Sequence, residues 1–359
     1  MEKILAGIPL VGIGPVLVIS AVGVFFLVLG ILAWRSHKVW SILSLSLFVG
    51  FGLAAGADYV NTQFAYFDNM ADLLGIPTYP TAEGATTSGA QLTPQPNGAV
   101  TSITVPDTQS HFGSYEAKVW LPPQYFTDAR AHFPVIILAH GNPGQPTDWL
   151  TSAGAPTSAL AVASSGKPVI LVMPVVLQNA ISGDSLCVDS ASQGNVETYI
   201  VKDVVAAVDD QLRTKVDPKQ RGIGGLSMGG FCALNLGLKH PEVFSVVLDF
   251  SGETESKPDT LPGGNQALYG GSDWQQKADA NSPSKYITSL NGKNGPAIWL
   301  DTGTGDTDIL TEMQSFLTKL KAQGFTAELH TRPGAHDYTV WSGAVKDALP
   351  WAAARFSSS

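Results

Sequence analysis

The segment that most restricts the fold of this chain is 223–230, which reads IGGLSMGG. A serine at the apex of a tight strand-to-helix turn has a strained backbone, so its close neighbours must lack bulky side chains. Gly225 and Gly229 meet this requirement on either side of Ser227. Such a turn predicts that Ser227 Oγ is exposed at the carboxyl end of a sheet, facing the N-terminus of the next helix.

The flanking sequence supports a strand, turn, helix and strand in this order. Residues 220–225 form a short approach that we interpret as a buried strand. Residues 231–241 have a helical pattern ended by a proline, and residues 243–250 form a second buried-strand run. The G-x-S-x-G pattern requires this context when its serine is a nucleophile. The alternative is a structural turn that happens to contain a serine.

Two long uncharged stretches lie near the N-terminus, at residues 4–34 and 39–57. Each is long enough to cross a hydrocarbon core, which takes ~20 residues. A signal peptide is the alternative for the first stretch, but the stretch is too long and a second one follows at once. Two buried core helices are the other alternative, although such helices seldom lack a polar face over this length. We therefore expect a two-span transmembrane anchor over residues 1–57.

Charge predicts the orientation of this anchor and excludes one class of partner. Arg35, His37 and Lys38 lie between the two spans, and the positive-inside rule places such a loop in the cytoplasm. Everything after residue 57 then faces outward, with Lys3 as the opposing charge. The formal net charge of −9 argues against nucleic-acid binding and leaves no basic patch for anionic lipid headgroups.

The region after the spans divides into a connecting segment, 58–99, and a globular domain, 100–359. Residues 58–67 are aromatic and weakly polar, as suits a membrane interface. Residues 77–99 are rich in Pro, Thr, Gly, Ser, Ala and Gln. That composition buries no core, and it predicts a flexible linker.

The globular domain alternates apolar strand patterns with helical ones. Continuous apolar runs are typical of parallel strands that are covered on both faces. The alternation predicts an α/β fold with a doubly wound, mostly parallel sheet. Besides the segments around Ser227, strands are expected at 102–105, 116–121, 134–139, 168–173, 297–300 and 327–330, and helices at 196–212, 309–322 and 339–355.

A serine nucleophile needs a base, and on this type of turn the chain order is Ser, then acid, then His. His330 and His336 are the two histidines that follow every plausible acid. His330 falls within a strand pattern and is expected to pack there. His336 lies in the turn 332–338, which opens at the same end of the sheet as Ser227. We select His336 as the base; the alternative is a surface-loop histidine.

The acid is expected after strand 297–300, where Asp301, Asp306 and Asp308 compete. Asp301 belongs to the end of the strand, and Asp308 is a reasonable N-cap for the following helix. Asp306 follows a glycine-rich loop that is flexible enough to turn a carboxylate toward the base, so we select Asp306. The outside candidates, which follow the preceding strand, are Glu253 and Glu255.

The oxyanion formed in an acyl transfer needs two backbone donors. The Met228 N–H, directly after the nucleophile, is the first expected donor. The second is the Asn142 N–H in the loop 140–144, where glycine allows a close approach to substrate. We expect His140 to hold this loop by hydrogen bonding rather than to perform chemistry. For substrate binding we select two aromatic side chains, with a place in the rim or core as the alternative: Trp149 and Trp274.

Cys187 and Cys232 are the two cysteines of the chain. Outside the cytoplasm such a pair predicts a disulfide, which would tie the polar loop 185–190 to the helix that follows the nucleophile. Two buried free thiols are the alternative. Neither cysteine has metal-ligand spacing around it, and we expect neither a metal nor a cofactor.

From about residue 100 to 356 the chain resembles the esterase D-type family of α/β-hydrolases. This family includes feruloyl and acetyl xylan esterases, S-formylglutathione hydrolase, and the mycolyltransferases of mycobacteria and corynebacteria. The spans and the aromatic segment resemble actinobacterial membrane-anchored members. The matching segments are 134–141, 225–230, 300–306 and 334–337. The family's serine, acid and histidine map to Ser227, Asp306 and His336, and its oxyanion donors to Met228 and Asn142.

The resemblance implies a membrane-anchored serine esterase or acyltransferase that acts on carboxylic esters in the cell envelope through an acyl-enzyme. The first alternative is a mycolyl- or other acyltransferase proper, with a sugar or lipid acceptor. Mycolyltransferases usually have a glutamate as the acid, so Asp306 favours the esterases. The second alternative is a non-catalytic envelope binding protein on a hydrolase scaffold. The expected location is the cell membrane, with two spans and an extracytoplasmic hydrolase domain.

Overall fold

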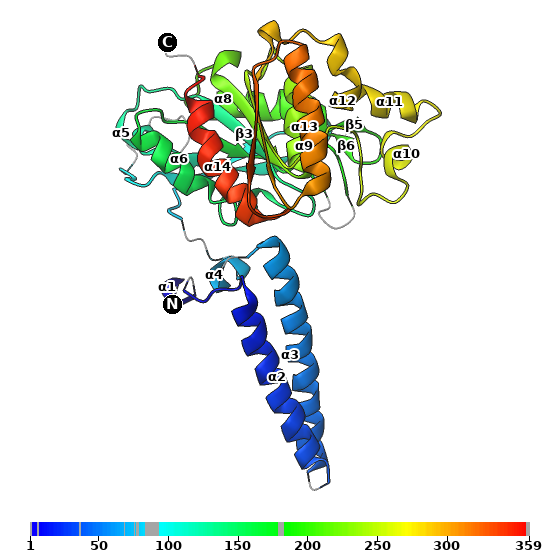
Figure 1. Ribbon diagram of the computed structural model, residues 1–359. Helices are drawn as coiled ribbons and strands as arrows, with labels where there is room; N and C mark the ends of the chain where they lie inside the picture. The colour runs from blue at the N-terminus through cyan, green and yellow to red at the C-terminus, as the bar shows by residue number, and fades with distance from the viewer. Residues whose placement is uncertain are drawn as a thin grey trace. The chain divides into compact units, whose positions relative to one another are not determined.

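The computed structural model describes residues 2–5, 7–35, 37–67, 69–74, 76, 79–82, 93–178 and 183–356. The chain divides into two compact units. The first, Met1–Thr78 with Asp337–Thr339, contains two long helices, and the second, Tyr79–His336 with Val340–Ser359, contains the sheet (Figure 1). Of the predicted linker, residues 77–78 and 83–92 lie outside the described residues.

The first unit is a hairpin of α2, Ile13–Ala33, and α3, Lys38–Phe64. Both helices are long and apolar enough to cross a membrane, by length and composition. Small residues let them approach closely, since a Cβ on Gly30 would lie 2.9 Å from Leu45 Cγ. Ser41 Oγ also donates a 2.6 Å hydrogen bond to the Gly30 carbonyl.

Helix α3 continues beyond residue 57 and includes residues 58–64, which the sequence analysis assigned to the interfacial segment. Polar side chains near its end hold the loop that precedes α2. Asn61 Nδ2 donates to the Leu10 carbonyl at 3.0 Å, and Thr62 Oγ1 donates to the Gly12 carbonyl at 3.3 Å. Two short helices complete the unit: α1, Glu2–Leu5, and α4, Met70–Leu73.

The second unit is built on an eight-stranded sheet with the order β1-β2-β4-β3-β7-β8-β9-β10. The pairs β1-β2 and β2-β4 are antiparallel, and the other pairs are parallel. This confirms the predicted doubly wound, mostly parallel sheet. The strands are β1 Ala99–Val105, β2 Tyr115–Leu121, β3 Val135–Ala139, β4 Ile170–Met173, β7 Arg221–Leu226, β8 Val246–Phe250, β9 Ala297–Gly303 and β10 Ala327–Arg332. A separate small hairpin pairs β5, Asp189–Ser190, with β6, Gly194–Asn195.

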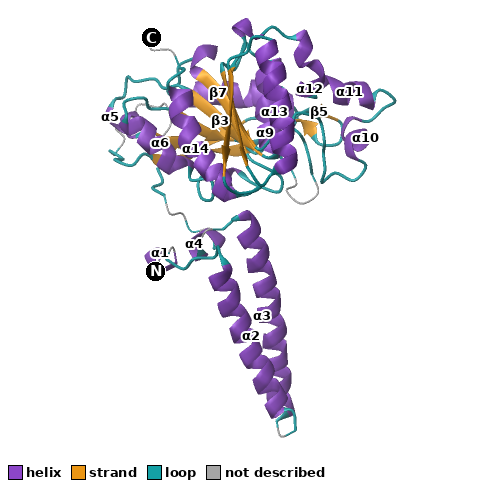
Figure 2. Cartoon of the chain, in the orientation of Figure 1, coloured by secondary structure: helices purple, strands orange, loops and turns teal. Residues whose placement is uncertain are grey.

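Helices connect the parallel strands, and Figure 2 shows the strands running between them. Helix α9 packs on β3, β7 and β8, and α13 packs on β9 and β10. The helix expected at 196–212 is present but contains a π-helical turn, Tyr199–Val204. The α-helices are α5 Pro123–Thr127, α6 Ala155–Ser164, α7 Val196–Thr198, α8 Val205–Gln211, α9 Met228–Lys239, α10 Gly264–Tyr269, α11 Trp274–Ala280, α12 Pro283–Tyr286, α13 Thr307–Ala322 and α14 Tyr338–Ala353.

Strand β7 is fully buried although half of its residues are glycines. A Cβ on Gly224 would lie 3.0 Å from Leu138 Cδ2 and 3.2 Å from Leu248 Cβ, in the neighbouring strands. The missing side chains therefore make room for those of β3 and β8 at the centre of the sheet. The buried strand predicted at residues 220–225 is confirmed.

A buried ion pair joins the last two strands. Asp301, fully buried in β9, accepts hydrogen bonds from Arg332 Nε at 2.9 Å and Nη2 at 2.5 Å. Trp299 Nε1 donates to the same carboxylate at 3.3 Å. Burial raises the pKa of Asp301, and the hydrogen bonds from Arg332 oppose that shift. Both oxygens of this carboxylate are thus engaged by Arg332.

The substitution Arg332→Met should leave the Asp301 carboxylate buried without its partner. Removing one member of a buried pair costs about 3–5 kcal/mol, so we expect a loss of this order in the free energy of unfolding. The double variant Asp301→Leu/Arg332→Met should recover most of it, because no charge is then left buried. Denaturant unfolding of the full chain measures both, and a single variant as stable as the double one would contradict the prediction.

Candidate active site

Ser227 stands on the turn between β7 and α9 with φ 56° and ψ −124°. A Cβ on Gly225 would lie 1.8 Å from the Gly229 carbonyl oxygen, and one on Gly229 would lie 2.2 Å from the Ala139 oxygen. Neither position therefore admits a side chain. The Ser227 N–H donates to the Phe250 carbonyl at 2.8 Å, which fixes the turn to the end of β8. The strained turn expected from the sequence is present.

The structure brings together the three side chains selected as nucleophile, base and acid. Ser227 Oγ lies 2.8 Å from His336 Nε2, and His336 Nδ1 lies 2.6 Å from Asp306 Oδ2. Residues 109 positions apart thus share one hydrogen-bonded chain. If Nδ1 carries the proton and donates it to Asp306, Nε2 is free to accept the proton of the serine hydroxyl.

Backbone hydrogen bonds join the loop of the acid to the loop of the base. The Gly305 N–H donates to the Gly334 carbonyl at 2.7 Å, and the Thr304 N–H donates to the Arg332 carbonyl at 2.8 Å. A Cβ on Gly303 would lie 2.5 Å from the Gly334 oxygen. We interpreted Gly303 and Gly305 as a source of loop flexibility. They instead allow the loop that contains Asp306 to lie close to the loop that contains His336.

Asp306 occupies the N-cap position of α13, yet its carboxylate makes no capping hydrogen bond. The expectation that Asp308 would be the N-cap was wrong, because Asp308 lies inside the first turn of the helix. Asp306 is therefore free to orient His336 Nδ1, as its 2.6 Å contact requires. The two other candidates for the acid have different surroundings. Burial raises the pKa of Glu253 to about 8, and Glu255 accepts a hydrogen bond from the Ser284 hydroxyl.

The loop after β3 passes close to the nucleophile. A Cβ on Gly141 would lie 3.4 Å from Ser227 Cβ and 2.8 Å from Leu226 Cδ1. The Asn142 side chain is already engaged, since its Nδ2 donates to a carbonyl at 2.8 Å and to a hydroxyl at 2.5 Å. Within the described part of the chain, neither the Asn142 N–H nor the Met228 N–H is a donor in any hydrogen bond.

His140 holds this loop, as expected. It is almost completely buried; its Nδ1 lies 2.8 Å from the Gly141 carbonyl, and its Nε2 accepts from the Val176 N–H at 3.2 Å. These partners fix a neutral imidazole with its proton on Nδ1. Burial lowers the pKa of His140 to about 4, with the hydrogen bond to Gly141 opposing the shift. A histidine with this pKa is uncharged at neutral pH.

The pKa of His140 predicts a loss of stability in acid. The folded value, about 4, lies below the ordinary value of 6.5, so the unfolded chain binds more protons between these two pH values. Stability is complete above pH 6.5 and declines as the pH falls toward 4, by on the order of 3 kcal/mol from this group. Thermal unfolding of the full chain at pH 7.5 and 5 should show the decline, and His140→Gln should reduce it. Equal pH dependence of both proteins would contradict the prediction.

The two aromatic side chains selected for substrate binding differ in their burial. Trp149 is completely buried and lies 6.3 Å, centroid to centroid, from the Phe250 ring, so its selection was wrong. Trp274 is half-buried and packs against the core at the start of α11. The sequence analysis missed Trp341, whose buried ring meets His336 edge to face at 4.9 Å. The one sequence feature that points to Trp341 is its position, as an aromatic residue in the first turn of the helix that follows His336.

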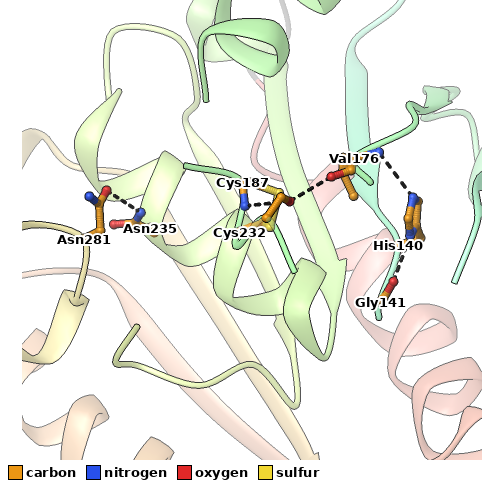
Figure 3. The surroundings of a disulfide bond; sticks show 8 residues. His140, Gly141, Val176, Cys187, Cys232, Asn235 and Asn281 are labelled. Carbon is orange, nitrogen blue, oxygen red and sulfur yellow. Dashed lines mark hydrogen bonds between the residues drawn. A yellow bond between two sulfur atoms is a disulfide. The ribbon is translucent and has the colours of Figure 1, made fainter. Parts of the chain in front are cut away.

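A disulfide joins Cys187 and Cys232 with a Cα–Cα distance of 5.3 Å (Figure 3). It links the polar loop before β5 to the nucleophile helix, which is the link that the sequence analysis expected. Among the residues that the structure describes, no group of three or more His, Cys, Asp or Glu side chains is arranged to hold a metal ion.

Comparison with known proteins supports a common family for this fold and site. The family model Esterase, described as "Putative esterase", matches residues 109–352. An uncharacterized protein of Corynebacterium glutamicum is 32% identical over 260 residues, which are 70% of this chain and 60% of the relative. Esterase Rv1288 of Mycobacterium tuberculosis is 28% identical over 243 residues, 61% of this chain and 51% of the relative. The chain thus spans between half and 60% of the length of these curated relatives.

Solved structures with the same fold include a ferulic acid esterase, with a TM-score of 0.61 and 22% identity over 72% of this chain and 99% of that one. An S-formylglutathione hydrolase from Agrobacterium tumefaciens has a TM-score of 0.59 and 17% identity over 73% of this chain and 97% of that one. MPT51 (FbpC1) of Mycobacterium tuberculosis has a TM-score of 0.55 and 14% identity over 71% of this chain and 98% of that one. At these identities the likeness is one of fold. The chain belongs to the Esterase family, and its sheet unit is an α/β-hydrolase of the esterase D type.

Proposed function

We propose that this protein is a membrane-anchored serine esterase or acyltransferase that acts on carboxylic esters through Ser227, His336 and Asp306. The single observation that carries the proposal is the hydrogen-bonded chain from Ser227 Oγ through His336 to Asp306, with distances of 2.8 and 2.6 Å. The strained turn and the family membership support the same chemistry.

In the first step, Ser227 Oγ attacks the ester carbonyl while His336 Nε2 takes the hydroxyl proton. The Asp306 carboxylate accepts the Nδ1–H bond, holds the imidazole in the reactive tautomer and stabilises its charged form without taking the proton. The imidazolium then donates its proton to the leaving alkoxide, and an acyl-enzyme remains. Water or an acceptor hydroxyl, deprotonated by the same imidazole, releases the acyl group.

The carbonyl oxygen becomes negatively charged in each tetrahedral intermediate. We assign its stabilisation to the Met228 and Asn142 N–H groups, which lie on the turn and on the loop beside Ser227 and make no other described hydrogen bond. Donors that are fixed before the reaction need no reorganisation when the charge develops, which makes such groups worth about 10²–10³ each in kcat.

The names of related proteins support the ester class without selecting one substrate. Relatives include an endo-1,4-beta-xylanase/feruloyl esterase, an acetyl esterase and an iron(III) enterobactin esterase. Their acyl and leaving groups differ, so the shared element is the carboxylic ester itself. Release to water makes the protein an esterase, and release to a sugar or lipid hydroxyl makes it a transferase.

We assign α2 and α3 to the membrane. Arg35 and Lys38 lie at the connection between the two helices, and the positive-inside rule puts that connection in the cytoplasm. The hydrolase unit then faces the outside of the cell, where a disulfide such as Cys187–Cys232 persists. The ester substrates would accordingly be envelope or extracellular molecules.

A fluorophosphonate probe tests the nucleophile. The full chain should be labelled and Ser227→Ala should not, because the probe reacts with an activated serine oxygen.

Asp306→Asn should lower kcat on a p-nitrophenyl ester by about 10⁴-fold, since it disfavours the reactive tautomer. Asp301→Asn is the matched control, because its carboxylate pairs with Arg332 instead. An unlabelled, folded native chain would favour the non-catalytic binding scaffold.

Reporter fusions test the orientation. Alkaline phosphatase joined after residue 356 should be active, and green fluorescent protein joined there should be dark, if the hydrolase unit is outside. Fusions placed between Arg35 and Lys38 should give the opposite result. The double substitution Arg35→Glu/Lys38→Glu should weaken the preference, because it removes the cationic bias of the loop. The reverse pattern in the native chain would refute the assigned orientation.

A further inference from the structure

The loop 183–187 is attached to the same helix as the nucleophile. Cys187, at its end, is bonded to Cys232, which lies in the second turn of α9, and α9 begins directly after Ser227. Leu186 and Cys187 have φ values of 44° and 49°, in the left-handed region that side chains other than glycine rarely adopt. The loop keeps this unfavourable backbone only while its surroundings hold it.

A first hydrogen-bonded route leads from this disulfide to the oxyanion loop, 140–144 (Figure 3). The Cys187 N–H donates to Ser185 Oγ at 3.1 Å, and Ser185 Oγ donates to the Val176 carbonyl at 2.8 Å. The Val176 N–H donates to His140 Nε2 at 3.2 Å, and His140 Nδ1 donates to the Gly141 carbonyl at 2.8 Å. All five residues of this route are buried.

A second route reaches the next residue of the oxyanion loop from the other end of loop 183–187. Asn142 Nδ2 donates to the Gly183 carbonyl at 2.8 Å and to Thr260 Oγ1 at 2.5 Å. Thr260 Oγ1 in turn lies 3.2 Å from Asp184 Oδ2, to which it can donate. Asp184 is 4% exposed, so this anchor lies inside the protein.

We propose that the disulfide-bonded loop 183–187 positions the oxyanion loop, with Ser185, Asp184 and Thr260 as positioning residues. The two routes hold Gly141 and Asn142, whose backbone passes the nucleophile. The disulfide fixes their common support to the nucleophile helix. The position of the second oxyanion donor relative to Ser227 therefore depends on a covalent bond outside the catalytic triad.

The proposal rests on the proposed esterase function and deepens it, because it makes turnover dependent on the oxidised state of the two cysteines. A dithiol reductant transfers two electrons and two protons to the disulfide; it becomes a cyclic disulfide and leaves two thiols. The strained loop can then relax and the oxyanion loop can move. Since a misplacement of about 1 Å can cost roughly 10²-fold in rate, transition-state stabilisation falls while ground-state binding of the ester is retained.

Steady-state kinetics of the full chain in detergent, with p-nitrophenyl butyrate as the probe substrate, test the proposal. Thr260→Val and the double variant Cys187→Ala/Cys232→Ala should lower kcat by about 10- to 100-fold at an unchanged KM. The affinity for a boronic acid, which forms a tetrahedral adduct on the serine, should fall by the same factor. Thr260→Ser, which keeps the hydroxyl, should restore native kinetics.

Asp203→Asn is the matched structural control. Asp203 is also buried and also anchors a loop, through Thr108 Oγ1 and the Gln109 and Ser110 N–H groups. It should lose stability without losing kcat. If the cysteine variant does not fold, Thr260→Val and Ser185→Ala decide the matter. Native kcat in these folded variants, or a raised KM at native kcat, overturns the proposal. A native chain that neither labels nor turns over overturns the proposed function instead.

Discussion

The backbone turn at Ser227 is the constraint on which the rest of the site depends. With φ at 56°, the serine leaves the sheet and starts a helix within one residue, and this is possible because Gly225 and Gly229 have no Cβ to collide with the backbone. The same close approach puts α9 against the end of β3. The loop 140–144, Ser227 and the N-terminus of α9 therefore meet at one point.

The parallel sheet explains why the other groups meet there. The loops after β3, β7, β9 and β10 all leave the same edge of the sheet, so residues far apart in the chain become neighbours. Glycines then let the loops of the acid and the base join through backbone hydrogen bonds. The disulfide adds a covalent link between the nucleophile helix and the loop that supports Asn142. The site is thus held by backbone contacts rather than by the side chains that would react.

Several predictions from the sequence depended on local rules, and these agree with the structure. The buried strand before Ser227, the packing of His330 within β10 and the structural role of His140 follow from pattern and position. Trp149 was selected wrongly, since its side chain is completely buried. The sequence around an aromatic residue does not show whether its ring lines a pocket or packs in the core. The prediction that Asp308 is the N-cap was wrong because helix starts are uncertain by a residue or two. The helix starts earlier, with Asp306 at the N-cap position, and the Asp306 carboxylate binds His336 instead of the helix.

The sequence by itself determined the α/β architecture, the turn at Ser227 and the two apolar helices, because each follows from hydrophobic period, glycine placement or length. Only the tertiary structure shows that Asp301 is paired with Arg332 and that Asp306 lies against His336. Asp301 lies within β9, where Arg332 on the adjacent strand neutralises it, whereas Asp306 lies just beyond the end of β9 and reaches His336. Likewise, only the folded chain shows that the Asn142 side chain is hydrogen-bonded to Gly183, in the loop that the disulfide holds. Contacts between segments distant in sequence depend on strand order and loop path, which local residue patterns do not encode.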